Sequence, residues 1–159
     1  MKKFIFIFLL ISSNLYSFDI VSSFNKFIEY DLKFIQDTNN GFSSTKSFGQ
    51  IYRKENVIEI KVDSPSKEKY VIGNTYIEIF DYDFNQTQRL ELNNKDLIFI
   101  KLLTEGIDDI SVKNITKDSF VYEKNDKKFH IKMLNESEFI INYFDNMEYE
   151  NSILFERIN

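Results

Sequence analysis

The sequence contains no cysteine and no tryptophan, and its 159 residues include only one proline and four glycines. The lack of cysteine excludes disulfide bonds, thiol catalysis and cysteine metal sites. It also excludes the acylated cysteine that anchors a bacterial lipoprotein. A chain without disulfides depends on its hydrophobic core, and we expect its stability to be the same under reducing and oxidising conditions.

Patterns that would indicate catalysis or metal binding are also missing. His130 is the only histidine, which argues against a zinc site and favours a solvated strand position. The acidic pairs in 81–83, 108–109 and 148–150 are of a kind common in loops. The glycines are isolated, and no Gly-x-Ser-x-Gly motif frames a serine. We therefore expect that the protein is not an enzyme and that it binds neither a cofactor nor a metal ion.

The net charge is −5, with acidic and basic residues interspersed along the chain. No basic stripe is available to neutralise phosphates, which argues against a nucleic-acid partner. The acidic balance also disfavours electrostatic binding to anionic membranes. The 17 phenylalanines and nine tyrosines, in contrast, need an apolar environment, either in a core or around a cavity.

The N-terminus has the three parts of a secretory signal peptide. Lys2 and Lys3 precede the apolar run 4–11, the polar residues 12–14 follow, and the small residue Ser17 stands before the first acidic residue, Asp19. The run is far shorter than the ~20 residues of a membrane-spanning helix. The alternative is a buried N-terminal strand. We predict a signal peptide over 1–17, cleaved near Ser17, and one soluble domain over 18–159 in the periplasm.

The rest of the chain reads as one helix followed by many short strands. Apolar residues over 20–29 have helical spacing, and the pattern over 30–36 then alternates. A second helix is expected over 97–103, ended by Gly106. The other expected strands are 48–52, 57–62, 70–72, 75–80, 86–92, 110–115, 120–124, 129–134, 139–144 and 149–155. Their spacing favours an antiparallel sheet, a barrel or a sandwich.

We predict a mainly β (α+β) fold, in which a curved antiparallel sheet forms an unclosed half-barrel and helices cover its concave apolar face. Alternation along the strands, together with the apolar side of the second helix, predicts the residues that line this face. They are Phe34, Ile58, Ile60, Ile77, Ile79, Phe120, Tyr122 and Phe139, with Phe99 and Leu102 from the helix. The face of strand 75–80 stays open, since Tyr76 and Phe80 are apolar too. The interior is either a ligand cavity or a packed core.

The order of these motifs resembles periplasmic lipoprotein carriers of the LolA type. In that family a helix leads into a strand with a Phe-x-Gln end, here within 30–36, and a Gly-x-aliphatic-aromatic strand follows, here 49–52. An apolar strand, a proline and a valine-rich hairpin come next, here 57–62, Pro65 and 71–83. The turn 54–56 has Lys-Glu-Asn where the family has Arg-Pro-Asn.

The resemblance implies a monomeric carrier rather than an enzyme. Such proteins accept acylated lipoproteins from an inner-membrane ABC-type exporter, shield the acyl chains in the half-barrel, and deliver them to an outer-membrane receptor. The resemblance makes Lys54 the candidate lid latch, facing the second helix. Three alternatives remain: a carrier or sensor of another lipid, a structural or adhesive β-domain with a packed interior, and a hydrolase that uses acids not recognised here.

Overall fold

The computed structural model describes residues 15–92 and 98–158. The helices are α1 (Leu15–Phe27) and α2 (Ile98–Thr104), with a short 3-10 helix η1 (Asp109–Ser111) after α2. The strands are β1 (Leu32–Asn39), β2 (Ser44–Arg53), β3 (Ile58–Ser64), β4 (Glu68–Ile72), β5 (Tyr76–Asp81), β6 (Gln86–Glu91), β7 (Val112–Lys113), β8 (Ser119–Lys124), β9 (Lys127–Asn135), β10 (Glu138–Phe144) and β11 (Glu150–Arg157).

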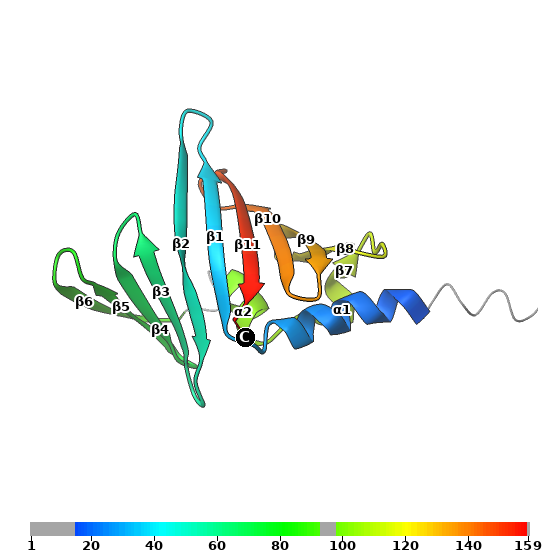
Figure 1. The fold of residues 1–159 in the computed structure, drawn as a ribbon, viewed down its shortest axis with the longest axis horizontal. Helices are drawn as coiled ribbons and strands as arrows, with labels where there is room; N and C mark the ends of the chain where they lie inside the picture. Colours follow the sequence, from blue (N-terminus) through cyan, green and yellow to red (C-terminus); the bar gives the residue numbers. More distant parts are fainter. Residues whose placement is uncertain (1–14, 93–97, 159) are drawn as a thin grey trace, which may run out of the picture.

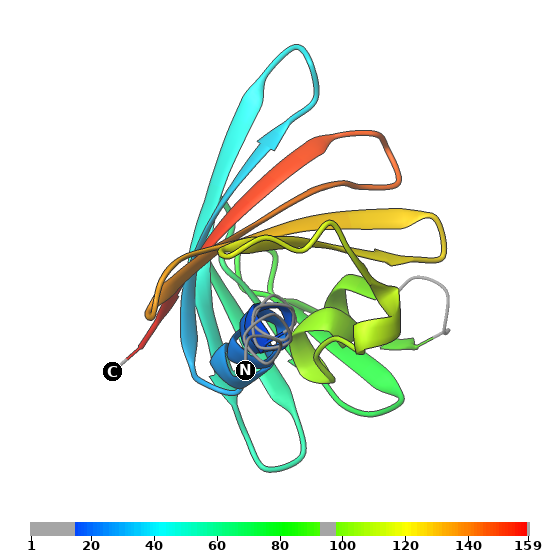
Figure 2. The same cartoon turned by 90° about the vertical axis from the view of Figure 1, so that its right-hand side faces the viewer.

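All these strands form one antiparallel sheet in the order β6-β5-β4-β3-β2-β1-β11-β10-β9-β8-β7 (Figure 1). Strands that follow one another in sequence pair with each other, except for β6 and β7, and β1 also pairs with β11. The described part of the sheet is unclosed, with β6 and β7 at its two edges. Both helices lie on the same side of the sheet, which curves around them (Figure 2).

A packed core fills the space between α1 and the strands β8–β11 and β1. Phe24 of α1 lies edge-on to Phe120, with ring centroids 5.8 Å apart, and to Phe139, at 5.1 Å. Phe139 in turn stacks on Phe155 at 4.8 Å. Phe24 and Phe139 have no exposed surface at all. Aromatic side chains of this size dominate the burial energy of a core, so this half of the sheet is held tightly to α1.

Gly49 is the one position in β2 where the fold leaves no room for a side chain. A Cβ atom there would lie 1.9 Å from the carbonyl oxygen of Lys61 and 2.9 Å from Cε1 of Phe34. The register between β2 and β3 shifts at this point, between Phe48 and Gly49. Glycine in a strand often marks a bulge or a close approach of another chain segment, and both occur here.

Most of the expected elements are present, close to their predicted bounds. The mainly β character and the large unclosed antiparallel sheet with two helices are confirmed. The strand predicted over 110–115 is wrong, because η1 occupies its first residues and only Val112–Lys113 pair with β8. The first helix begins at Leu15 rather than at residue 20, before the predicted cleavage point. Residue 97, predicted as the start of the second helix, lies outside the described residues.

Candidate ligand-binding site

A pocket of about 480 Å³ lies between α2 and the inner face of the sheet around β1–β5. Its volume falls within the roughly 300–1,000 Å³ typical of small-molecule sites. Most of its wall is aliphatic or aromatic. The lining residues are Phe34, Gln36, Ser47, Ile51, Ile60, Val62, Pro65, Ser66, Glu68, Tyr70, Ile72, Ile77, Phe99, Ile100, Leu103, Ile153 and Phe155.

The apolar wall is built by cross-strand neighbours that share one face of the sheet. Ile60 of β3 lies opposite Ile51 of β2 and opposite Tyr70 of β4. Ile72 of β4 lies opposite Ile77 of β5. Because side chains two residues apart share a face, this register places Ile77 on the inner face and Tyr76 on the outer one. The structure therefore shows which side chains of β5 face inward, a question that the alternation in the sequence did not answer.

Helix α2 forms the cover of the pocket. Phe99, Ile100 and Leu103 line the pocket itself. Phe99 is also held from the other side, since its ring stacks on Tyr143 at 5.1 Å and on Phe129 at 6.1 Å. The helix thus packs against the filled half of the sheet and borders empty space over the other half.

Asn25 fixes the chain just after α2. Its side-chain amide donates to the carbonyl of Ile107 at 3.0 Å and accepts from the Ile107 N–H at 2.8 Å. Gly106 lies between the end of α2 and Ile107. Its φ of 78° is the left-handed conformation in which a helix commonly ends. The end of α2 is thereby tied to α1, while its other flank faces the pocket.

One end of the pocket is polar. Gln36, Ser47, Ser66 and Glu68 line it there. The Gln36 amide donates to Oδ1 of the buried Asn151 at 2.8 Å, and Thr38 donates to the same oxygen at 2.7 Å.

Tyr70 also reaches this polar end. Its hydroxyl donates to the Glu68 carboxylate. Burial, reinforced by that hydrogen bond, raises the pKa of Tyr70, so its hydroxyl stays neutral. The pocket therefore combines an apolar body with a polar end that carries hydrogen-bonding groups.

The structure divides the predicted cavity residues into two groups. Phe34, Ile60, Ile77 and Phe99 line the pocket. Ile58 borders a second, neighbouring pocket, and Ile79 lies on the same inner face, opposite Tyr70.

The other predicted lining residues lie in the packed core rather than in a pocket wall. They are Leu102, Phe120, Tyr122 and Phe139, each at most 2% exposed. The difference comes from α1, which covers β8–β11 and leaves the inner face of β3–β5 to α2 alone. Alternation identifies the inner face, but it does not say which part of that face a helix will cover.

Sequence reasoning missed several wall residues, among them Ile51, Val62, Ile72, Leu103 and Phe155. Each of the four strand residues among them follows the same alternation as the residues that were predicted. The signal was thus available along the strands. The polar end at Gln36 and Asn151 had no such signal, because it is formed by the pairing of β1 with β11.

Lys54 lines the second pocket, which has a volume of about 540 Å³ and a mostly polar wall. This pocket lies beside the C-terminal end of α2. Thr104 and Glu105 form the far wall of this pocket. Within the described part of the chain, no hydrogen bond or ion pair joins the Lys54 side chain to α2. Lys54 thus faces the helix from across a gap, and its role as a latch remains a prediction.

The neighbouring Arg53 makes contacts that the sequence did not suggest. Its backbone N–H donates to Oδ1 of Asp31 at 2.7 Å, and its Nε donates to the carbonyl of Tyr30 at 3.5 Å. Burial lowers the pKa of Arg53, and the charge of Asp31 opposes that effect. These contacts tie the end of β2 to the connection between α1 and β1.

Two of the acidic residues noted in the sequence shape turns. Asp81 accepts hydrogen bonds from the backbone N–H groups of Asp83 and Phe84 and so shapes the β5–β6 turn. Asp108 does the same for Ser111, and His130 is exposed on the outer face. Among the described residues, no group of acidic and histidine side chains could hold a metal ion, and no helix is long and apolar enough to cross a membrane.

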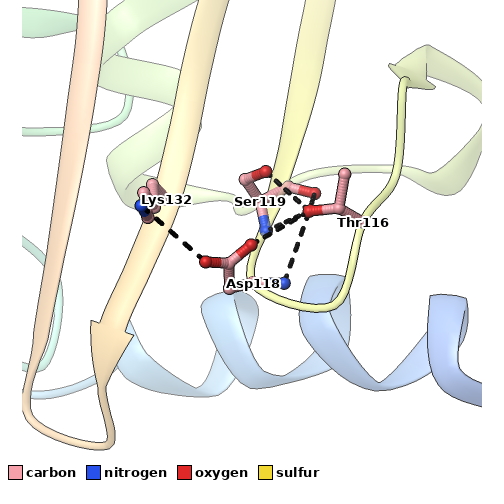
Figure 3. Close-up of polar contacts among 4 residues, drawn as sticks. All are labelled: Thr116, Asp118, Ser119 and Lys132. Atoms are coloured by element: carbon pink, nitrogen blue, oxygen red, sulfur yellow. Dashed lines mark hydrogen bonds and ion pairs between the residues drawn. The ribbon is translucent and has the colours of Figure 1, made fainter.

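A polar cluster before β8 is likewise a turn rather than a site (Figure 3). Thr116 accepts the backbone N–H of Ser119 at 3.0 Å and donates to Asp118 at 3.1 Å. Asp118 also forms an ion pair with Lys132 at 3.8 Å. All these contacts are exposed, and they fix the entry of the chain into β8.

No protein-family model and no curated protein matches the sequence. Among solved structures, the chain is similar to an uncharacterized conserved protein from Thermus thermophilus, with 10% identity, a TM-score of 0.47, and 89% of this chain and 86% of that chain covered. It is also similar to a DUF1329 family protein from Desulfovibrio piger, with 8% identity, a TM-score of 0.40 and 90% of each chain covered. These likenesses are too distant to bear on function.

Proposed function

We propose that this protein is a LolA-like periplasmic carrier that shields the acyl chains of lipoproteins between the inner and outer membranes. In this proposal the sheet is a half-barrel whose concave apolar face is covered by the helices. The observation that supports it best is the apolar pocket under α2, bounded by Ile60, Ile72 and Ile77. Each methylene removed from water contributes ~0.8 kcal/mol, so an acyl chain needs such a shield to leave a membrane.

The pocket also suits the release of its cargo. A carrier has to bind acyl chains and then give them up without its own energy source. The filled side of α2 is held by Phe99 and by the Asn25–Ile107 contacts, while the other side has no packed neighbour to displace. A movement of α2 would change the pocket, while the part of the core that joins α1 to β8 and β10 through Phe24, Phe120 and Phe139 would keep its own contacts. Such a movement would shift the balance between loaded and empty states.

The remaining parts of the proposal follow from the sequence. Export rests on the signal-peptide pattern of residues 1–17, and it would place the carrier where lipoproteins cross between membranes. Its partners would be an inner-membrane ABC-type exporter and an outer-membrane receptor, and the carrier would be a monomer without enzymatic activity. Detection of Met1 on the protein purified from cells would contradict the export step.

A second candidate function is the transport or sensing of a different lipid. The mixed polar end at Gln36, Ser47 and Glu68 favours it, since these groups would bind an ester, amide or hydroxyl headgroup equally well. A structural β-domain would instead leave the pocket empty. Native mass spectrometry of the protein purified from its own compartment separates the three, by showing a bound lipopeptide, a bound free lipid or neither.

The site is tested by binding of a fluorescent fatty-acyl probe. Ile60→Lys places a charge on the inner face and should abolish binding. Val71→Lys is the matched control, because Val71 lies on the outer face opposite Glu59 and Glu78 and should leave binding unchanged. Thermal unfolding of both variants shows that they are folded. Equal binding by the parent protein and Ile60→Lys, or none by the parent, would rule out this pocket as the acyl site.

A further inference from the structure

Five turns connect strands at the same edge of the sheet, which we call the distal end. They are 40–43, 65–67, 82–85, 125–126 and 145–149. The register places them there: Asn39 pairs with both Ser44 and Glu150, and Glu68 pairs with Asp81. The β1–β2 hairpin projects farthest, as Figure 1 shows. The 3-10 helix η1 reaches the same end, because Asp108 just before it contacts Lys124 at 3.6 Å.

The distal end carries the most exposed apolar side chains among the described residues. Every described large hydrophobic residue that is more than half exposed lies there. These are Phe42 at 100%, Ile110 at 95%, Phe84 at 73%, Met147 at 70%, Phe144 at 61% and Tyr82 at 57%. At the opposite end, Leu134 and Ile115 are 45% and 41% exposed. Single exposed apolar residues are common on protein surfaces, but here all the most exposed ones lie at one end, and we take this end as the candidate interaction surface.

The candidate pocket extends to this same end. Pro65 and Ser66, of the turn 65–67, form part of its wall, and so do Gln36 and Ser47 near the distal ends of β1 and β2. One wall of the pocket is therefore continuous with the distal turns.

We propose that the distal end docks on the surface of a zwitterionic lipid bilayer, with Phe42 inserted among the headgroups and the pocket opening at the membrane. This inference rests on the proposed function, because it states where the pocket would take up or release its acyl cargo. Docking would let the acyl chain move between membrane and pocket without crossing water, where each exposed methylene costs free energy.

The spacing of the apolar groups favours a bilayer over a protein partner. Phe42, Phe84 and Met147 stand on three different hairpins, separated by polar turn residues. A protein interface buries a contiguous apolar centre, whereas a bilayer accepts separate apolar side chains at the level of its headgroups.

The charge of the distal turns selects the kind of lipid. They contain four acidic residues, Asp83, Asp126, Asp145 and Glu148, and a single lysine, Lys67. An anionic surface would repel them, and the repulsion would be screened by salt. A zwitterionic surface carries no such penalty, and this is why the proposal names it.

The absence of tryptophan from the chain makes a direct test simple. Phe42→Trp introduces a single reporter, whose emission should shift to the blue on addition of phosphatidylcholine vesicles, as indoles favour the membrane interface. Leu134→Trp, at the opposite end, is the matched control and should show no shift. A shift in both variants, or in neither, would overturn the proposal.

Vesicle flotation then measures the strength of binding. Phe42→Ala should weaken association with phosphatidylcholine vesicles about tenfold or more, while Leu134→Ala should leave it unchanged. Adding phosphatidylglycerol at low salt should weaken the association of the parent protein. No association of the parent, or stronger association with phosphatidylglycerol, would contradict the proposal.

Acyl-probe binding in solution keeps this inference separate from the proposed function. Phe42→Ala should bind the probe as the parent does, since Phe42 lies outside the pocket. Probe binding without vesicle association would overturn only the docking inference. Vesicle association without probe binding would overturn the proposed function.

Discussion

The two halves of the sheet use the same alternating pattern but differ in what covers it. On β8–β11 the inner side chains meet α1, and Phe120, Ile131 and Phe139 are at most 1% exposed. On β3–β5 the corresponding residues Ile60 and Ile77 are only half-buried and face a pocket. One sheet can therefore supply both a rigid core and an adaptable apolar surface, depending on which part of its inner face the helices cover.

The comparison predicts its largest effect in the filled half. Phe139→Ala should lower the free energy of unfolding by about 3–5 kcal/mol, because it removes a ring in contact with Phe24, Phe27 and Phe155. Denaturant unfolding measures the change. A loss below about 1 kcal/mol would mean that α1 does not pack on this half as described.

A somewhat smaller effect is expected where the two halves meet. Gly49→Ala should cost about 1–3 kcal/mol, since its Cβ would collide with the backbone of β3. Gln50→Ala is the matched control, because that side chain projects from the neighbouring position of β2. Equal stability of both variants in thermal unfolding would show that the close approach of β3 at Gly49 is absent.

The open half should tolerate truncation better than the filled half. Ile60→Ala should cost about 1 kcal/mol, below the roughly 2–5 kcal/mol typical of an aliphatic residue truncated to alanine in a packed core. Ile131→Ala, in the filled half, provides that comparison. Ile60→Ala should also weaken acyl-probe binding, which Ile131→Ala should not. Equal destabilisation by both changes would indicate that the open half is packed as tightly as the other.

The smallest effect concerns pH. A hydrogen bond from Lys113 lowers the pKa of Glu123. A carboxyl group whose pKa is lower in the folded state stabilises the fold at pH values above its unfolded-state pKa. This stabilisation is lost as the pH falls through the folded-state pKa. Lys113→Ala should therefore raise the Glu123 pKa in an NMR titration. An unchanged titration would remove this contact from the account.

The sequence predicted the sheet well because its strands alternate and are separated by clear turn signals. It placed Phe34 and Ile60 on the inner face, where they line the pocket, and it left open the face of the strand that carries Ile77. It could not separate Phe120 and Phe139 from them, because burial there depends on α1, which is far away in sequence.

Two other errors have similar causes. The segment 110–115 is apolar enough for a strand, yet η1 takes its place. Arg53 was overlooked beside Lys54, since its contacts with Tyr30 and Asp31 exist only once α1 has joined β1.

The isoleucine methyl groups offer the most direct test of the central claim, because both halves contain them. Methyl NMR spectra should be recorded while a diacylated lipopeptide is added. We predict that the signals of Ile60, Ile72 and Ile77 shift, while those of Ile131 and Ile141 in the filled half stay in place. No shift in either half, or shifts confined to the filled half, would contradict the account.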